Sequence, residues 1–178
     1  FQVADLFEYT PPATFDVVVS LGVLHHTRDC LGAIRRVFKD FVKPGGQALI
    51  GLYHSYGRQP FLQQFEEMKA VGATEDEMLA RFRAMESRIV DETQMLSWFR
   101  DQVLHPHETQ HSLEEIMPLI DECGMSLVST SINRFRAISS LDALYAEEKT
   151  YQQRAEAYLK DGKYFPGFFV FLVSKPQA

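Results

Sequence analysis

Histidines that could do acid–base chemistry stand directly after two apolar runs of the sequence. His25 and His26 follow the run 15–21, and His54 follows the run 48–53. Imidazole titrates near neutral pH, so these three side chains are candidates for a general base or for a substrate contact. For the pair at 25–26 there is a plain alternative, in which one histidine packs at a helix entrance and the other faces solvent.

The segment after the second apolar run carries a further candidate binding site. Arg58 could bind an anionic group of a substrate, with Tyr53 or His54 orienting the acceptor. The same residues could instead form a polar connection between a strand and a helix. A position just after a strand favours the functional interpretation.

A polar segment at 101–111 contains three more histidines, among them His105 and His107. His-x-His spacing can converge on a metal ion. Pro106 between them favours an extended chain, which would point the two rings in roughly opposite directions. We therefore predict no metal site here. Trp98 and Tyr164, on either side of this segment in the sequence, are interpreted as packing residues.

A strand–helix–strand unit must position the first two sites. The run 15–21 is continuously apolar and predicts a strand buried on both faces, as in a parallel sheet. Asp29 is a plausible helix N-cap, and apolar residues recur at helical spacing from 31 to 41. Proline and glycine at 43–46 predict a turn before a second buried strand at 48–53. This is a βαβ unit, which implies a parallel pair of strands.

The rest of the sequence alternates helices and strands. We expect amphipathic helices from 58 to about 100, a helix opened by Ser112 and closed by Gly124, and a helix at 141–159. Strands are expected at 127–132 and 168–173. The sequence therefore predicts one α/β domain over residues 1–178, with a helical insertion at about 58–111.

Composition narrows the class of protein. The 178 residues are 46% hydrophobic and carry a net charge of −6, so nothing in the charge balance calls for nucleic acid. The two cysteines suggest neither a disulfide framework nor a zinc site. No apolar run is long enough for a membrane span, and no signal sequence opens the chain. We expect a cytoplasmic protein.

Two segments of the sequence resemble a known family. The run 15–27, ending in Val-Leu-His-His-Thr, and the run 42–50, containing Lys-Pro-Gly-Gly, are similar to class I S-adenosylmethionine-dependent methyltransferases of the type 11/12 kind. The resemblance implies a Rossmann-like sheet, present here from the third strand onward, with S-adenosylmethionine as cofactor. It assigns the adenine to Asp5 and Leu6, and the methionine part of the cofactor to Ser20, Leu21 and Gly22.

The resemblance also concerns the methyl acceptor. It places His25 and His26 near the transferred methyl group. It makes His105 and His107 part of a lid over the acceptor, which we expect to be a small molecule methylated on oxygen, nitrogen or carbon. Because in-line transfer from a sulfonium depends mainly on alignment, the reaction often needs no strong base.

The chain departs from the family pattern at its start. The glycine-rich loop and the acidic residue for the ribose should precede Phe1, where the chain opens as if at the end of a strand. We therefore expect an N-terminally truncated chain that binds the cofactor weakly or not at all. An apolar strand edge left exposed would favour a homodimer or higher oligomer. The alternative function is a degenerate, non-catalytic assembly domain.

Overall fold

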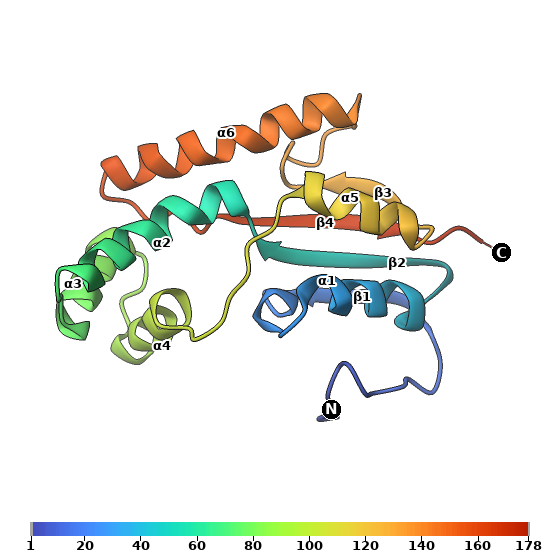
Figure 1. Cartoon of the computed structure of the whole chain (residues 1–178), viewed down its shortest axis with the longest axis horizontal. Coiled ribbons are helices and arrows are strands. Elements are labelled where there is room, and N and C mark those ends of the chain that lie inside the picture. Colours follow the sequence, from blue (N-terminus) through green and yellow to red (C-terminus); the bar gives the residue numbers. More distant parts are fainter. Residues whose placement is uncertain (1, 178) are drawn as a thin grey trace.

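The computed structural model describes residues 2–177, which form one mixed sheet and a set of helices (Figure 1). The sheet order is β1-β2-β4-β3, with β1 parallel to β2 and with β4 antiparallel to both of its neighbours. The strands are β1 (Phe15–Leu21), β2 (Val42–Tyr53), β3 (Ser126–Thr130) and β4 (Phe168–Ser174). The predicted α/β class and the parallel β1–β2 pair are confirmed.

Helices connect these strands in the predicted order. They are the 3-10 turn η1 (Leu24–His26), α1 (Cys30–Arg36), the π-helical turn η2 (Val37–Phe41), α2 (Ser55–Ala70), α3 (Glu75–Met85), α4 (Glu92–Val103), α5 (Leu113–Glu122) and α6 (Leu141–Lys160). The Asp29 side chain accepts a hydrogen bond from the Gly32 N–H, so it caps α1 as predicted. None of the helices within residues 2–177 is long and apolar enough to cross a membrane.

Three predicted boundaries are wrong. The strand expected at 127–132 is β3, which ends at Thr130. The segment 43–46 does not separate a helix from a strand but lies within β2, where the register jumps from Phe15↔Val42 to Val17↔Gln47. Gly45, at a φ of 78°, allows this bulge because glycine tolerates positive φ. Helix α2 begins at Ser55 rather than near 58, because His54 serves as its N-cap.

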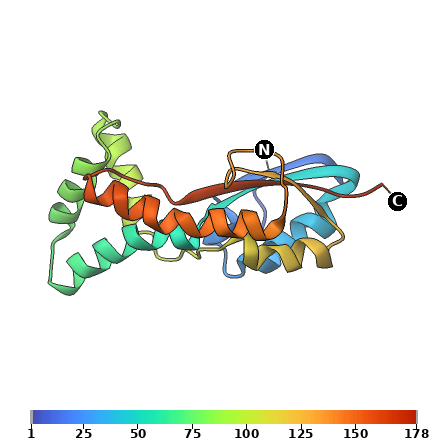
Figure 2. The same cartoon turned by 90° about the horizontal axis from the view of Figure 1, so that it is seen from above.

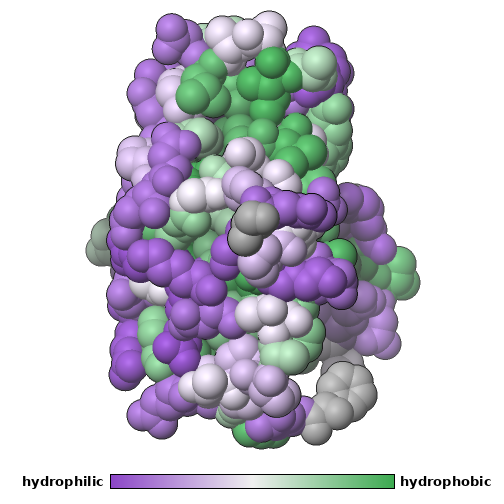
Figure 3. Space-filling model, turned by 90° about the vertical axis from the view of Figure 1, so that its right-hand side faces the viewer, coloured by the Kyte–Doolittle hydropathy of each residue, from purple (hydrophilic) through white to green (hydrophobic). Residues whose placement is uncertain are grey.

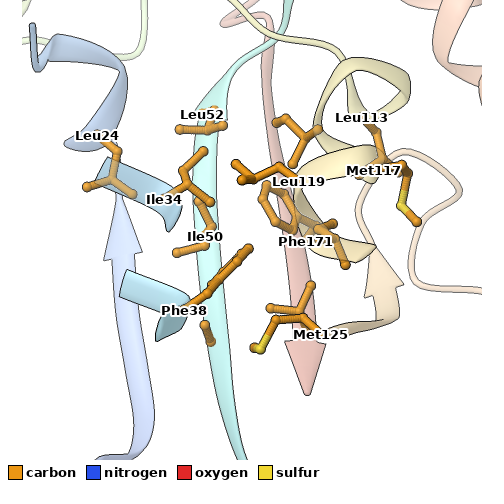
Figure 4. Close-up of a cluster of buried hydrophobic side chains, with 14 of the residues drawn as sticks. Leu24, Ile34, Phe38, Ile50, Leu52, Leu113, Met117, Leu119, Met125 and Phe171 are labelled. Atoms are coloured by element: carbon orange, nitrogen blue, oxygen red, sulfur yellow. The ribbon is translucent and has the colours of Figure 1, made fainter. Parts of the chain in front are cut away.

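The main core lies between the sheet and the helices α1, α5 and α6, which share one face of it (Figures 1 and 2). Side chains from β2 and β4 meet those of α1 and α5 there, as Figure 4 shows. Ile34, Phe38, Ile50 and Phe171 are all fully buried. This layer fixes where the strand ends lie.

A second cluster of buried side chains joins α2, α3 and α4, in the region predicted as a helical insertion. Phe61, Phe65, Phe82 and Phe99 form its centre, and Tyr164 packs against Phe61 and Phe82. Residues just before β4 therefore tie the three helices to the sheet.

The prediction that the first strand is buried on both faces is wrong. Val17 and Val19 are each 58% exposed and Leu21 is 48% exposed, because the packed helices lie on the other face of the sheet. Hydrophobic side chains also reach the surface at the end of the molecule near the C-terminus (Figure 3). Residues 2–14 form no strand, contrary to the expectation that residues 1–5 are the end of one; Phe1 itself lies outside the described residues.

Candidate functional site

A cavity of about 450 Å³ lies where the parallel strands β1 and β2 end. Four of the sequence-predicted site residues line it, from the end of β1, from η1 and from the end of β2. The lining residues are Leu21, Gly22, His26, Tyr53, Trp98, Asp101, Gln102, Tyr164, Pro166 and Phe168. Ligands of open α/β sheets bind beyond the carboxyl ends of strands, so this position is the one expected of a ligand site.

Two glycines shape the backbone around the cavity. Gly22 has a φ of 72°, and its N–H donates to the Gly51 carbonyl, so the chain turns out of β1 into η1 while still held against β2. Gly167 has a φ of 56°, and a Cβ there would lie 2.4 Å from the Arg58 nitrogen. The first turn of α2 can therefore approach the start of β4 only with glycine at this position.

His25 does not contact the cavity but supports the residues that do. It is fully buried, and its Nδ1 accepts the Tyr53 backbone N–H at 3.2 Å. Burial, together with the charges of His26 and Arg58, lowers the pKa of His25 to about 3. His25 is therefore neutral at ordinary pH, and with Nδ1 accepting, its proton must be on Nε2.

The neighbouring His26 receives that proton in a hydrogen bond. The Nε2 atoms of His25 and His26 are 3.0 Å apart, so the His26 Nε2 accepts. The His26 Nδ1 lies 3.0 Å from the His107 carbonyl oxygen, to which it must donate. Both ring nitrogens of His26 are thus engaged. A role as general base would require His26 to give up the bond from His25.

His105 and His107 come together at His26. The His105 ring packs on the His26 ring at 3.9 Å between centroids, and the His107 Nε2 donates to the Thr27 carbonyl at 3.0 Å. We predicted that Pro106 would point the His105 and His107 rings in opposite directions, but both rings lie against the turn at His26 and Thr27. The His107 backbone N–H donates to the His105 Nδ1, which keeps the two residues together. No cluster of three metal-ligating side chains occurs within residues 2–177.

Arg58 stands behind the cavity rather than in it. Its guanidinium is fully buried between the rings of Tyr53 and Phe61, at 4.1 and 4.7 Å from their centroids. It donates to both carboxylate oxygens of Glu108 at 2.9 Å. Burial acts to lower the Arg58 pKa, but the Glu108 carboxylate raises it overall. With its charge already paired, Arg58 does not offer the anion site that its sequence position suggested.

His54 also lies outside the cavity, although the sequence predicted a catalytic role for it at the site. It is fully buried, its Nδ1 accepts the Gly57 N–H at the start of α2, and its Nε2 lies 2.9 Å from Glu148. The Glu148 carboxylate in turn accepts the backbone N–H groups of Leu113 and Glu114, at the start of α5. These contacts give His54 and Glu148 a structural role in joining three helices.

The residues predicted to bind the cofactor are divided by the structure. Leu21 and Gly22 line the cavity, whereas Ser20 is half-buried on β1 beside it. Asp5 is exposed and its Oδ1 accepts the Phe7 N–H at 2.7 Å. The Leu6 carbonyl accepts from Arg36, next to α1. Asp5 and Leu6 do not line the cavity, because their segment is held against α1.

Sequence reasoning missed a polar group in the cavity wall, the side chain of Gln102. The Gln102 side chain is 2.6 Å from the Tyr53 hydroxyl and 2.5 Å from the Tyr164 hydroxyl. Burial raises the pKa of both tyrosines, which therefore keep their protons at neutral pH. Gln102 sits one turn after Trp98 on α4, and Tyr164 is far away in the sequence, so no local pattern brought them together.

The structure is similar to those of proteins of known fold. PKMT2 from Rickettsia typhi matches at 13% identity and a TM-score of 0.61, over 96% of this chain and 37% of that one. The structure of PKMT2 from Rickettsia typhi in complex with AdoHcy matches at 11% identity and a TM-score of 0.62. This match covers 99% of this chain and 39% of that one. The present chain thus spans less than two-fifths of the length of those proteins. Phosphoethanolamine N-methyltransferase 2 from Haemonchus contortus, at 17% identity and a TM-score of 0.45, covers 97% of this chain and 36% of its own, and is too dissimilar to support an argument.

At these identities the likeness establishes the fold alone. The four-stranded mixed sheet with its helices matches methyltransferase-fold structures, which agrees with the fold predicted from the sequence. The sequence matches no protein-family model and no curated protein.

Proposed function

We propose that the cavity at the ends of β1 and β2 serves S-adenosylmethionine-dependent methyl transfer to a small-molecule acceptor. The observation that carries the proposal is the position of Leu21, Gly22, His26 and Tyr53 around one cavity at the carboxyl ends of parallel strands. The shared fold with PKMT2, one structure of which holds AdoHcy, supports the choice of cofactor.

The described residues fit only part of that cofactor. Leu21 and the rings of Tyr53 and Phe168 offer apolar and aromatic surface suited to the sulfonium end, where the bound cofactor would supply an electrophilic methyl group. Asp5 lies outside the cavity lining, and the printed sequence has no glycine-rich loop opening a helix after a strand. We therefore propose that this chain alone binds the cofactor weakly.

The part of this chain in the reaction is to hold and align an acceptor. Tyr53, Trp98 and Phe168 supply aromatic wall surface, and hydroxyl and carboxylate groups on the same wall fix orientation. Because both nitrogens of His26 are engaged, alignment contributes more than base catalysis. His26 lines the acceptor site, whereas His105 and His107 do not line it and contribute by contacting the His26 ring.

Titration with S-adenosylhomocysteine, followed by ¹H–¹⁵N NMR and by calorimetry, tests this proposal. We expect weak binding, with the largest shift changes at residues that line the cavity, among them Gly22, Tyr53 and Phe168. Leu21→Trp, which fills the cavity, should abolish these changes, while Val17→Trp on the same strand but outside the cavity lining should not. Shift changes located elsewhere, or none at millimolar ligand, would refute the methyltransferase function. Micromolar binding at the cavity would refute only the proposal that this chain binds the cofactor weakly.

A second candidate function is a non-catalytic assembly domain. The exposed apolar residues of β1 favour it, since this strand pairs only with β2 in the described part of the chain. On this alternative, AdoHcy leaves the spectrum unchanged while the chain still self-associates. We propose self-association for either function, through β1.

A further inference from the structure

The hydrogen bonds behind the cavity fix which groups it can offer to a ligand. Arg58 Nη1 donates to the Gln102 side-chain oxygen at 3.0 Å, and Arg58 Nη2 donates to the Gln102 backbone carbonyl at 2.7 Å. A guanidinium only donates, so the atom that faces Nη1 must be the amide oxygen, Oε1. The amide nitrogen, Nε2, therefore faces the other way, and it lies 2.6 Å from Asp101 Oδ2, an acceptor.

The amide orientation then determines the direction of two tyrosine hydroxyl bonds. Nε2 donates to the Tyr53 oxygen, so the Tyr53 proton is left for another partner. Oε1 accepts the Tyr164 proton, so the Tyr164 oxygen keeps its free lone pairs. The amide now uses both protons and both lone pairs. Within residues 2–177 the Tyr53 hydroxyl donates to no other residue.

We propose that Gln102, held by Arg58, is a specificity-determining residue that makes Tyr53 a donor and Tyr164 an acceptor toward the cavity. Both tyrosines line the cavity and are almost fully buried, so a ligand must meet the polarity of these hydroxyls. The Asp101 carboxylate adds a second acceptor on the same wall.

The ligand chemistry follows from this wall and its apolar surroundings. Trp98, Phe168 and Pro166 suit a flat, mostly apolar group. A planar ligand with a hydrogen-bond acceptor next to a donor, such as a carboxamide on an aromatic ring, matches Tyr53 and Tyr164 together. A carboxylate offers acceptors only and would face Asp101. This inference rests on the proposed function only in taking the cavity as the acceptor site.

Three probes of similar shape test the polarity by NMR titration: benzamide, acetophenone and toluene. Benzamide has an acceptor and a donor, acetophenone has an acceptor only, and toluene has neither. We expect affinity to fall in that order, by about threefold to tenfold for each hydrogen bond lost. Equal affinities, or no detectable binding of benzamide, would overturn the proposal.

Two variants separate this role from a merely structural one. Tyr53→Phe should weaken benzamide and acetophenone by about threefold to tenfold but leave toluene unchanged. Tyr164→Phe should weaken benzamide alone. Tyr158→Phe, at an exposed tyrosine on α6, is the control. Loss of toluene binding in parallel with benzamide would contradict the proposal. The assay contains no AdoHcy, so benzamide selectivity can persist even if the methyltransferase function fails.

Discussion

At the residue scale, the histidines beside the cavity form one hydrogen-bonded row rather than a set of free bases. The Tyr53 N–H, His25, His26 and the His107 carbonyl are linked in sequence by bonds of 3.0 to 3.2 Å. Each ring needs a defined tautomer for the row to hold. His25 contributes by remaining neutral while buried, which connects its protonation to the stability of the fold.

This connection predicts an effect of pH on stability. The pKa of His25 is about 3 in the folded chain and 6.5 at its ordinary value, so below pH 6.5 the unfolded chain takes up a proton that the folded chain does not. The free energy of unfolding should therefore fall as pH decreases from 6.5 toward 3, by up to about 1.4 kcal/mol per pH unit from this group. Above pH 6.5 the titration of His25 does not change the free energy of unfolding.

Denaturant unfolding from pH 7 to pH 4.5 measures that slope. In His25→Asn the Asn oxygen can still accept the Tyr53 N–H, but the titrating group is gone, so the slope should flatten. His107→Asn, at an exposed histidine, should retain most of it. An unchanged slope in His25→Asn would contradict the assignment.

At the scale of elements, a single buried carboxylate joins three helices. Glu148 on α6 accepts the first backbone N–H groups of α5 and contacts His54, which caps α2. Free N–H groups at a helix start must find acceptors when buried, and here a side chain from another helix supplies them. The strand end of β2 is thereby held between α2 and α5, and Tyr53 is positioned at the cavity.

Glu148→Ala should be strongly destabilising. It leaves His54 and two N–H groups unsatisfied in the interior, and we expect the free energy of unfolding to fall by about 3 kcal/mol. Glu156→Ala, at an exposed site on the same helix, is a matched control with the same change in residue type. Chemical denaturation of both variants measures the difference. Equal stabilities would show that the carboxylate does not hold the helices together.

At the scale of the whole molecule, the sheet is covered unevenly. Helices pack on one face, and β1 leaves Val17, Val19 and Leu21 exposed next to an edge that is unpaired among the described residues. Exposed apolar strands at sheet edges pair readily with other chains. The proposed self-association is thus a property of the sheet rather than of the cavity.

The mass in solution tests this proposal. Light scattering at tens of micromolar should give at least twice the chain mass of 20.4 kDa. Val17→Lys combined with Val19→Lys should give a monomer, because two charges would have to be buried in the interface. Val71→Lys combined with Val90→Lys, at exposed valines away from β1, should leave the mass unchanged. A wild-type mass of 20.4 kDa would refute the proposal.

The sequence alone determined the elements and the fold class, because these depend on local periodicity and on capping residues. Phe15–Leu21, the Asp29 cap and the final strand were all predictable in this way. Four of the residues that it predicted for a site, Leu21, Gly22, His26 and Tyr53, lie around one cavity at the ends of the parallel strands. Only the tertiary structure showed that Arg58 and His54 are buried in structural pairs, because their partners Glu108 and Glu148 are distant in the sequence. Pairing across such distances follows from packing, so the Gln102 group and the uncovered face of β1 could be seen only there.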